Sequence, residues 1–142
     1  MISFNYETTF RLKQVKQHRA WLSKVIVSEN KKEGDINYIF CSDDYLLEIN
    51  KSYLNHDTLT DIISFDYSVG NELHGDIYIS IDRVRENAQD FKVSFDDELK
   101  RVLVHGVLHY CGYKDKSKKD ESLMRLKEDE KIKMFHVEQP LK

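Results

Sequence analysis

Alternating hydrophobic and polar residues predict two strands near the start of the chain. Ile2, Phe4 and Tyr6 alternate with polar neighbours, and residues 36–40 repeat this two-residue period with Ile, Tyr and Phe at the apolar positions. Because successive side chains of a strand point to opposite faces, each segment predicts a strand with one buried face.

Two β-branched and aromatic runs occupy the middle of the chain, at residues 61–67 and 76–81. The stretch between them, from Gly70 to Gly75, has the composition of a turn. We therefore expect two antiparallel strands joined by a hairpin loop.

A hydrophobic period of three to four residues predicts helices elsewhere. The first such run extends from Arg11 to about Glu29, and Gly34 breaks the pattern after it. Capping residues mark further helix starts: Ser42 precedes an acidic first turn, and Ser94 with Asp97 three positions on resembles a capping box. The helix after Ser42 is predicted to end near residues 50–53. The later predicted helices run from Ser80 or Asp82 to 91, from 94 to 111 and from about 118 to 135.

The order of these elements favours an α+β fold. Strands and helices intermix without the regular strand-helix repetition of a doubly wound sheet, so we expect one small mixed β-sheet packed with helices. A length of 142 residues suits a single domain, 1–142, with a continuous core. The order of the strands in the sheet is not readable from the pattern.

Composition and charge narrow the classes of function. The 22 Lys and Arg residues against 25 Asp and Glu give a net charge of -3, so any basic surface for nucleic acid must be local. Two cysteines, Cys41 and Cys111, make a disulfide framework improbable. The N-terminus has no signal-peptide pattern, and the chain has no apolar run long enough to span a membrane. We expect a cytoplasmic protein that does not associate with membranes.

His105 and His109 form a candidate metal-binding pair. Four residues correspond to about one turn of a helix, so both imidazoles project from one face, with the ligand spacing of a zincin helix. An incidental pair of surface histidines would show the same spacing. Gly106 stands where zinc peptidases of this type carry their catalytic Glu, which disfavours peptidase activity.

The turn after this helix supplies a candidate third ligand. Gly112 suits a positive φ at the helix end, where the chain reverses, and Asp115 follows it. Two imidazoles and a carboxylate leave one tetrahedral position of Zn²⁺ open, as in catalytic sites. Spacing alone leaves Asp115 equally consistent with a solvated charge in the run from Lys114 to Glu121. Cys111 would face the opposite side of the helix from His109, which argues against it as a ligand.

Most of the chain resembles the YbeY family. That family's signature is His-Gly-x-Leu-His, a Gly-Tyr turn and a third zinc ligand, matched here by His105, Gly106, Leu108, His109, Gly112 and Tyr113. Two strand segments add to the resemblance, since 60–65 (Thr-Asp-Ile-Ile-Ser-Phe) and 75–79 (Gly-Asp-Ile-Tyr-Ile) are similar to consecutive family strands.

The resemblance implies a zinc-dependent, single-strand-specific endoribonuclease that acts in ribosomal RNA maturation, notably at the 3′ end of 16S rRNA, and in ribosome quality control. It implies about one Zn²⁺ per chain, held by His105, His109 and Asp115, an RNA precursor as substrate and ribosomal subunits or ribosome-associated proteins as partners. The alternative is a non-catalytic ribosome-assembly factor with a structural zinc.

Two departures from the family pattern bear on the site. Asp115 stands where the family usually has a third His, and Leu54 stands where it commonly has an Arg that faces the substrate phosphate. Arg101, one turn before His105, is a candidate substitute, or else an ion-pair partner of Asp97 or Glu98. The catalytic acid and base are not identified.

Other polar residues are weaker candidates. Asp61 and Ser64 match the family's strand and suit either a partner for a ligand imidazole or a strand-edge contact. His56 lies in a neighbouring loop. A basic cluster beside the proposed metal is a candidate RNA-binding surface or a solvated helix start, and it consists of Lys114, Lys116, Lys118 and Lys119.

Overall fold

The computed structural model, which describes residues 1–56 and 58–137, contains one mixed sheet and a set of helices, so the α+β class is confirmed. The elements in chain order are β1 (Ile2–Tyr6), α1 (Val15–Ser28), β2 (Lys32–Cys41), α2 (Asp43–Leu54), β3 (Ile62–Asp66), β4 (Glu72–Ser80), α3 (Ile81–Phe91), α4 (Phe95–Tyr110) and α5 (Lys118–Val137). None of the helices in this described part is both long and apolar enough to cross a membrane.

The sheet has the strand order β1-β2-β4-β3. Strands β1, β2 and β4 run parallel to one another, which requires crossover connections, while β3 pairs with β4 in the antiparallel hairpin that the sequence predicts. The register places Phe4 beside Tyr38 and Tyr38 beside Ile77, so the apolar residues of three strands share one face.

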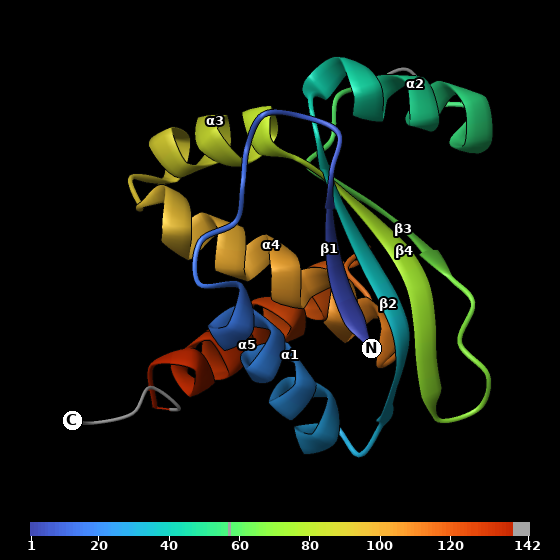
Figure 1. Cartoon of the computed structure of the whole chain (residues 1–142), viewed down its shortest axis with the longest axis vertical. Helices are drawn as coiled ribbons and strands as arrows, with labels where there is room; N and C mark the ends of the chain where they lie inside the picture. The colour runs from blue at the N-terminus through green and yellow to red at the C-terminus, as the bar shows by residue number, and fades with distance from the viewer. Residues whose placement is uncertain (57, 138–142) are drawn as a thin grey trace.

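Helices α1, α4 and α5 lie on that apolar face (Figure 1) and close the main core. The two-residue period of the strands and the helical period of these segments supply its side chains, as hydrophobic burial requires. Helix α2 covers part of the other face, where Leu46 packs with Cys41 and Ile63. Helices α1 and α5 are joined on the apolar face by a buried hydrogen bond, in which the indole of Trp21 donates to the carbonyl of Lys131 at 2.7 Å.

Helix α4 lies close against the sheet because position 106 is a glycine. A Cβ atom at Gly106 would come within 2.9 Å of the Cδ1 atom of Ile77 on β4, so a larger side chain would require Ile77 or the helix to shift. The buried hydroxyl of Tyr38 on β2 donates to the carbonyl of Leu103 at 2.7 Å and fixes the same helix. These contacts set the position of the residues on either side of Gly106.

The predicted helix caps are confirmed. The hydroxyl of Ser94 accepts a hydrogen bond from the backbone N–H of Asp97 at 3.0 Å, and Ser42 caps α2 in the same way. Of the two candidates before α3, Ser80 is the cap, and its hydroxyl accepts from the N–H of Arg83.

The first helix begins later than the sequence predicts. Its hydrophobic period starts at Arg11, but α1 begins at Val15 because Gln14 has φ of 54° and interrupts any earlier helical turn. Leu12 is still buried, but it reaches the core from an irregular segment. Hydrophobic spacing alone does not separate these two ways of burying a leucine.

The predicted hairpin loop of residues 70–75 is too long, because strand β4 already begins at Glu72 and includes residues 72–75. The parallel partner β2 extends β4 backward, pairing Lys32 with Glu72 across an irregularity between Glu33 and Ile36. The sequence analysis has Gly34 break the first helical pattern, but α1 ends earlier, at Ser28, and Gly34 lies inside β2.

Candidate metal centre

Two imidazoles of α4 converge at the surface of the molecule. His105 and His109 lie one helical turn apart, as their spacing predicts, and their Nε2 atoms are 3.0 Å apart. Both side chains are largely but not fully buried, so the site is open on one side.

The turn after α4 returns the chain to these imidazoles. Gly112 has φ of 105°, and the N–H groups of Gly112 and Tyr113 donate to the carbonyls of His109 and Leu108. This pair of bonds is a Schellman motif, which favours glycine at the position of positive φ. The reversed chain places the Oδ2 atom of Asp115 3.2 Å from Nε2 of His109 and 3.3 Å from Nε2 of His105.

The hydrogen bonds on the far side of each ring set its tautomer. Nδ1 of His105 lies 2.7 Å from a carboxylate oxygen of Glu128, and Nδ1 of His109 lies 2.9 Å from the carbonyl oxygen of Tyr113. Both partners only accept, so each Nδ1 carries a proton and donates it. The two Nε2 lone pairs therefore face each other and the carboxylate of Asp115, an arrangement that a cation stabilises.

The spacing of the three atoms fits one metal ion. Nitrogen and oxygen ligands about 2.0 to 2.2 Å from a tetrahedral zinc lie about 3.3 to 3.6 Å from one another. The separations here are 3.0, 3.2 and 3.3 Å, and among the described residues these three side chains form the one such cluster. His105, His109 and Asp115 therefore fit a metal with a fourth position open.

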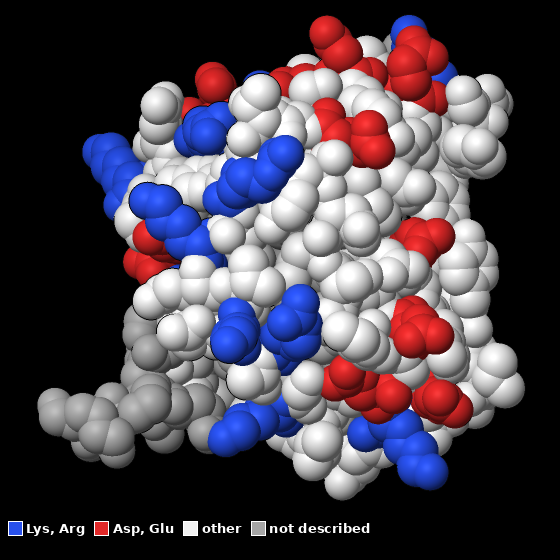
Figure 2. Space-filling model, in the orientation of Figure 1, with Lys and Arg blue, Asp and Glu red and all other residues white. Residues whose placement is uncertain are grey.

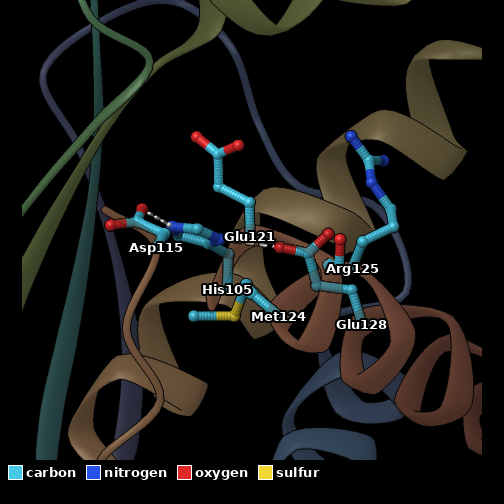
Figure 3. Close-up of a pocket in the computed structure, with 7 residues that line it drawn as sticks. His105, Asp115, Glu121, Met124, Arg125 and Glu128 are labelled. Atoms are coloured by element: carbon cyan, nitrogen blue, oxygen red, sulfur yellow. Dashed lines mark hydrogen bonds and ion pairs between the residues drawn. The ribbon is translucent and has the colours of Figure 1, made fainter. Parts of the chain in front are cut away.

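Glu128 also sets the electrostatics of His105. Burial lowers the pKa of His105, but the hydrogen bond and charge of Glu128, with the charges of Asp115 and Asp61, outweigh it and raise this pKa. Glu128 is 5% exposed, and its other oxygen accepts from Arg101 at 2.9 Å. Figure 3 shows His105 between Asp115 on one side and Glu128 on the other.

Arg101 is held by partners that the sequence analysis did not name. Its guanidinium pairs with Glu128 and, at 2.7 Å, with Asp129, both on α5. Asp97 and Glu98, the partners considered from the sequence, form no ion pair with it in the described residues. The geometry joins Arg101 to His105 through Glu128.

Two cavities adjoin the three converging side chains. One, of about 420 Å³, is lined by His105, His109 and Asp115 together with Asp61 and Ser64. Burial raises the pKa of the Asp61 carboxyl more than the charge of His105 lowers it. The other cavity, of about 600 Å³, is shown in Figure 3.

Arg125 lines both cavities and is a residue that the sequence analysis missed. Its guanidinium forms no ion pair with any described residue. In Figure 3 its side chain and that of Glu121 extend to the same side of the cavity. A free guanidinium beside a metal centre suits a phosphate oxygen.

Glu128 was also missed, although a signal for it exists in the sequence. It lies four residues after the buried Met124 on α5, on the apolar side of that helix. A carboxylate on an apolar stripe needs a buried partner, and the histidine helix is the natural place to seek one.

The other candidates lie outside this cluster. The four lysines of the basic cluster are exposed in the segment after α4 and the start of α5, and none lines the two cavities. Leu54 and His56 are exposed and line neither cavity, and Cys111 packs against the core. The basic cluster stays a prediction.

Comparisons with known proteins identify the family of this chain. Residues 3–136 match the family described as "Endoribonuclease YbeY". A protein of that name from Flavobacterium psychrophilum is 72% identical over 98% of this chain and 99% of its own length. Another from Bacteroides thetaiotaomicron is 47% identical over 80% of this chain and 83% of its own.

A solved structure is similar over almost the whole fold. The solution structure of TM1509 from Thermotoga maritima superimposes with a TM-score of 0.69 at 26% identity, covering 97% of this chain and 91% of that one. The family match spans β1 to α5 and includes the histidine helix and the turn that carries Asp115. On this evidence the chain belongs to the YbeY family of endoribonucleases.

Proposed function

We propose that this protein is a zinc-dependent endoribonuclease of ribosomal RNA maturation, with His105, His109 and Asp115 as the zinc ligands. Family membership makes it a hydrolase that cleaves RNA. The observation that carries the metal assignment is the convergence of two imidazole Nε2 atoms and one carboxylate oxygen within about 3.3 Å of one another.

The residues around the metal have distinct roles in this proposal. Bound there, zinc supplies Lewis acidity toward a phosphoryl oxygen and lowers the pKa of water in the open position. Glu128 and the carbonyl of Tyr113 hold the imidazole protons at Nδ1 and so keep both Nε2 atoms available as ligands. Arg101 positions Glu128.

Asp61 is the candidate proton donor at the cavity. Its carboxyl lines the same cavity as the two histidines, and its raised pKa keeps a proton on it at higher pH than on an exposed carboxyl. A protonated acid at this place can donate to the oxygen that leaves when a phosphodiester breaks.

In this proposal Arg125 binds the substrate phosphate, because the family's common Arg is replaced by Leu54 in this chain. Arg125 lines both cavities, whereas Leu54 has no charge and lines neither. The lysine cluster at the start of α5 extends this basic surface and contacts phosphates farther along a single strand.

The biological setting is proposed from the relatives. Their name gives an endoribonuclease. The resemblance to the YbeY family implies the rest, which we include in the proposal: action on ribosomal RNA precursors, including the 3′ end of 16S rRNA, a part in ribosome quality control, and ribosomal subunits as partners. We place this activity in the cytoplasm, and we treat residues 1–142 as one hydrolase domain.

Zinc content and RNA cleavage, measured on the same preparations, test the proposal. We expect about one zinc per purified chain and loss of both zinc and cleavage in His105→Ala and His109→Ala. His56→Ala is the matched control, because His56 is exposed and lies outside the cluster, and it should keep both. Full zinc in both single variants would place the metal elsewhere. Zinc binding without any cleavage of single-stranded RNA would favour the assembly factor with a structural zinc.

A further inference from the structure

A second cavity with a basic lining lies on another side of α4. It has a volume of about 730 Å³, and it is enclosed by the segment before α1, by α3 and by the first turns of α4. It shares no lining residue with the cavities beside the metal centre. Its volume is within the range of small-molecule sites.

The charge of this lining is strongly one-sided. Four cationic side chains line it, and Asp96 is the one carboxylate among its lining residues; the cations are Arg11, Lys13, Arg85 and Lys100. None of the four forms an ion pair within the described part of the chain. Figure 2 shows basic side chains gathered over α1, α3 and the start of α4, although the protein as a whole is acidic.

Lys100 distinguishes the cavity from an ordinary basic surface. Its side chain is only 6% exposed, and its ammonium lies 4.4 Å from the ring centre of Phe135 and has no carboxylate partner among the described residues. A buried ammonium normally has a counter-charge, because removing it from water is unfavourable. Since Lys100 lines the cavity, the cavity is where an anion would meet it.

The apolar residues of the lining indicate that the anion carries an organic group. A phosphate alone would fill little of the cavity, and Phe10, Leu12, Phe95 and Leu99 supply apolar walls. Arg85 already lies over the ring of Phe95 at 5.3 Å, which places a guanidinium at the edge of this apolar region. Several separate cations suit the oxygens of a phosphate ester better than the single charge of a carboxylate.

We propose that this cavity is a second ligand site, which binds the phosphate of a nucleotide through Lys100 and Arg85. The nucleotide is either free or part of an RNA strand. In both cases the phosphate meets the buried ammonium and the apolar walls contact the rest of the nucleotide. This site does not depend on the metal, so its occupancy and the nuclease activity are separable.

Isothermal titration of the full-length, zinc-loaded protein with uridine 5′-monophosphate tests the proposal. We expect binding that weakens about tenfold or more in Arg85→Gln and in Lys100→Met, because each removes a charged contact to phosphate. Arg85 is exposed, so its variant keeps the test valid even if Lys100→Met does not fold. Lys32→Gln, an exposed lysine at the start of β2, is the matched control and should bind as the wild type does. The proposal would be overturned if Arg85→Gln bound the nucleotide with unchanged affinity and Lys100→Met either did so too or did not fold.

Two further arms identify the ligand. Uridine without phosphate should bind at least about tenfold more weakly, and equal binding of uridine would overturn the phosphate assignment. A short oligoribonucleotide, titrated into the zinc-stripped protein, supports an RNA strand as the source if Arg85→Gln weakens it too, and a free nucleotide if it does not.

Discussion

Glu128 of α5 accepts a hydrogen bond from Nδ1 of His105 on α4, at 2.7 Å. The bond links two consecutive helices and settles which nitrogen of His105 faces the candidate metal centre. Because Arg101 in turn pairs with Glu128, the helix that carries the histidines also fixes their partner. The orientation of His105 thus depends on how α5 packs on α4.

Replacing Glu128 should weaken zinc without unfolding the protein. In Glu128→Gln the charge next to His105 is lost, so we expect zinc affinity to fall about 10- to 100-fold in a competition with a chelator. Asp129→Asn is the matched control, because Asp129 contacts the same Arg101 and does not contact His105. Equal zinc affinity of the wild type and Glu128→Gln would show that this hydrogen bond does not position a ligand.

Asp115 should be a direct ligand. Asp115→Asn replaces a charged oxygen donor by a neutral one, so its zinc affinity should fall, whereas Asp115→His restores a nitrogen donor of the family type and should retain zinc. Zinc content after dialysis measures both. An anomalous-scattering map with the metal on the two histidines and on Cys111 or His56 would reject the assignment.

RNA binding should depend steeply on salt, even though the net charge is -3. Each neutralised phosphate of a single strand contributes roughly -0.7 to the slope of log K against log salt, so three or four contacts predict a slope of roughly -2 to -3. The double variant Lys118→Ala, Lys119→Ala should flatten this slope and leave zinc content unchanged. The same titration of Arg125→Gln measures the contact at the cavity. An unchanged slope in the lysine variant would make the cluster a solvated surface.

His18 should make stability depend on pH. Burial lowers the pKa of His18 from 6.5, so below pH 6.5 the unfolded chain binds a proton that the folded chain does not. The contribution of neutral His18 to the free energy of unfolding is present above pH 6.5 and is lost as the pH falls from 6.5 to the lowered pKa of the folded state. His18→Gln lacks this loss, so its free energy of unfolding should fall less than that of the wild type over this range. Urea denaturation above and below pH 6.5 measures the difference, and parallel pH profiles would refute the assignment.

The elements of the fold were largely predictable because their local signals agree with their environment. Alternation gave the strand faces, and serines such as Ser94 gave the helix starts. The errors have two sources. Gln14 takes a positive φ that delays the start of α1, which the hydrophobic period does not record, and pairing with the distant strand β2 extends β4 back to Glu72. The strand order also depends on tertiary packing, which no local pattern records.

The candidate site divides in the same way. His105, His109 and Asp115 belong to one helix and its turn, so the helical spacing grouped the two histidines, while Asp115 was selected over a solvated charge only with the family resemblance. Glu128 and Arg125 belong to α5, and their approach to the histidines depends on how two helices pack. A sequence with no contact information does not supply that step.

The central claim is that RNA cleavage depends on one zinc held by His105, His109 and Asp115. Its most direct test is the rate of single-stranded RNA cleavage as zinc is added stepwise to the zinc-stripped protein. We predict no cleavage without zinc and a rate that rises in proportion to bound zinc until about one ion per chain, where it levels off. Cleavage at the full rate before zinc is added, or a rate that does not change as the metal binds, would contradict the account.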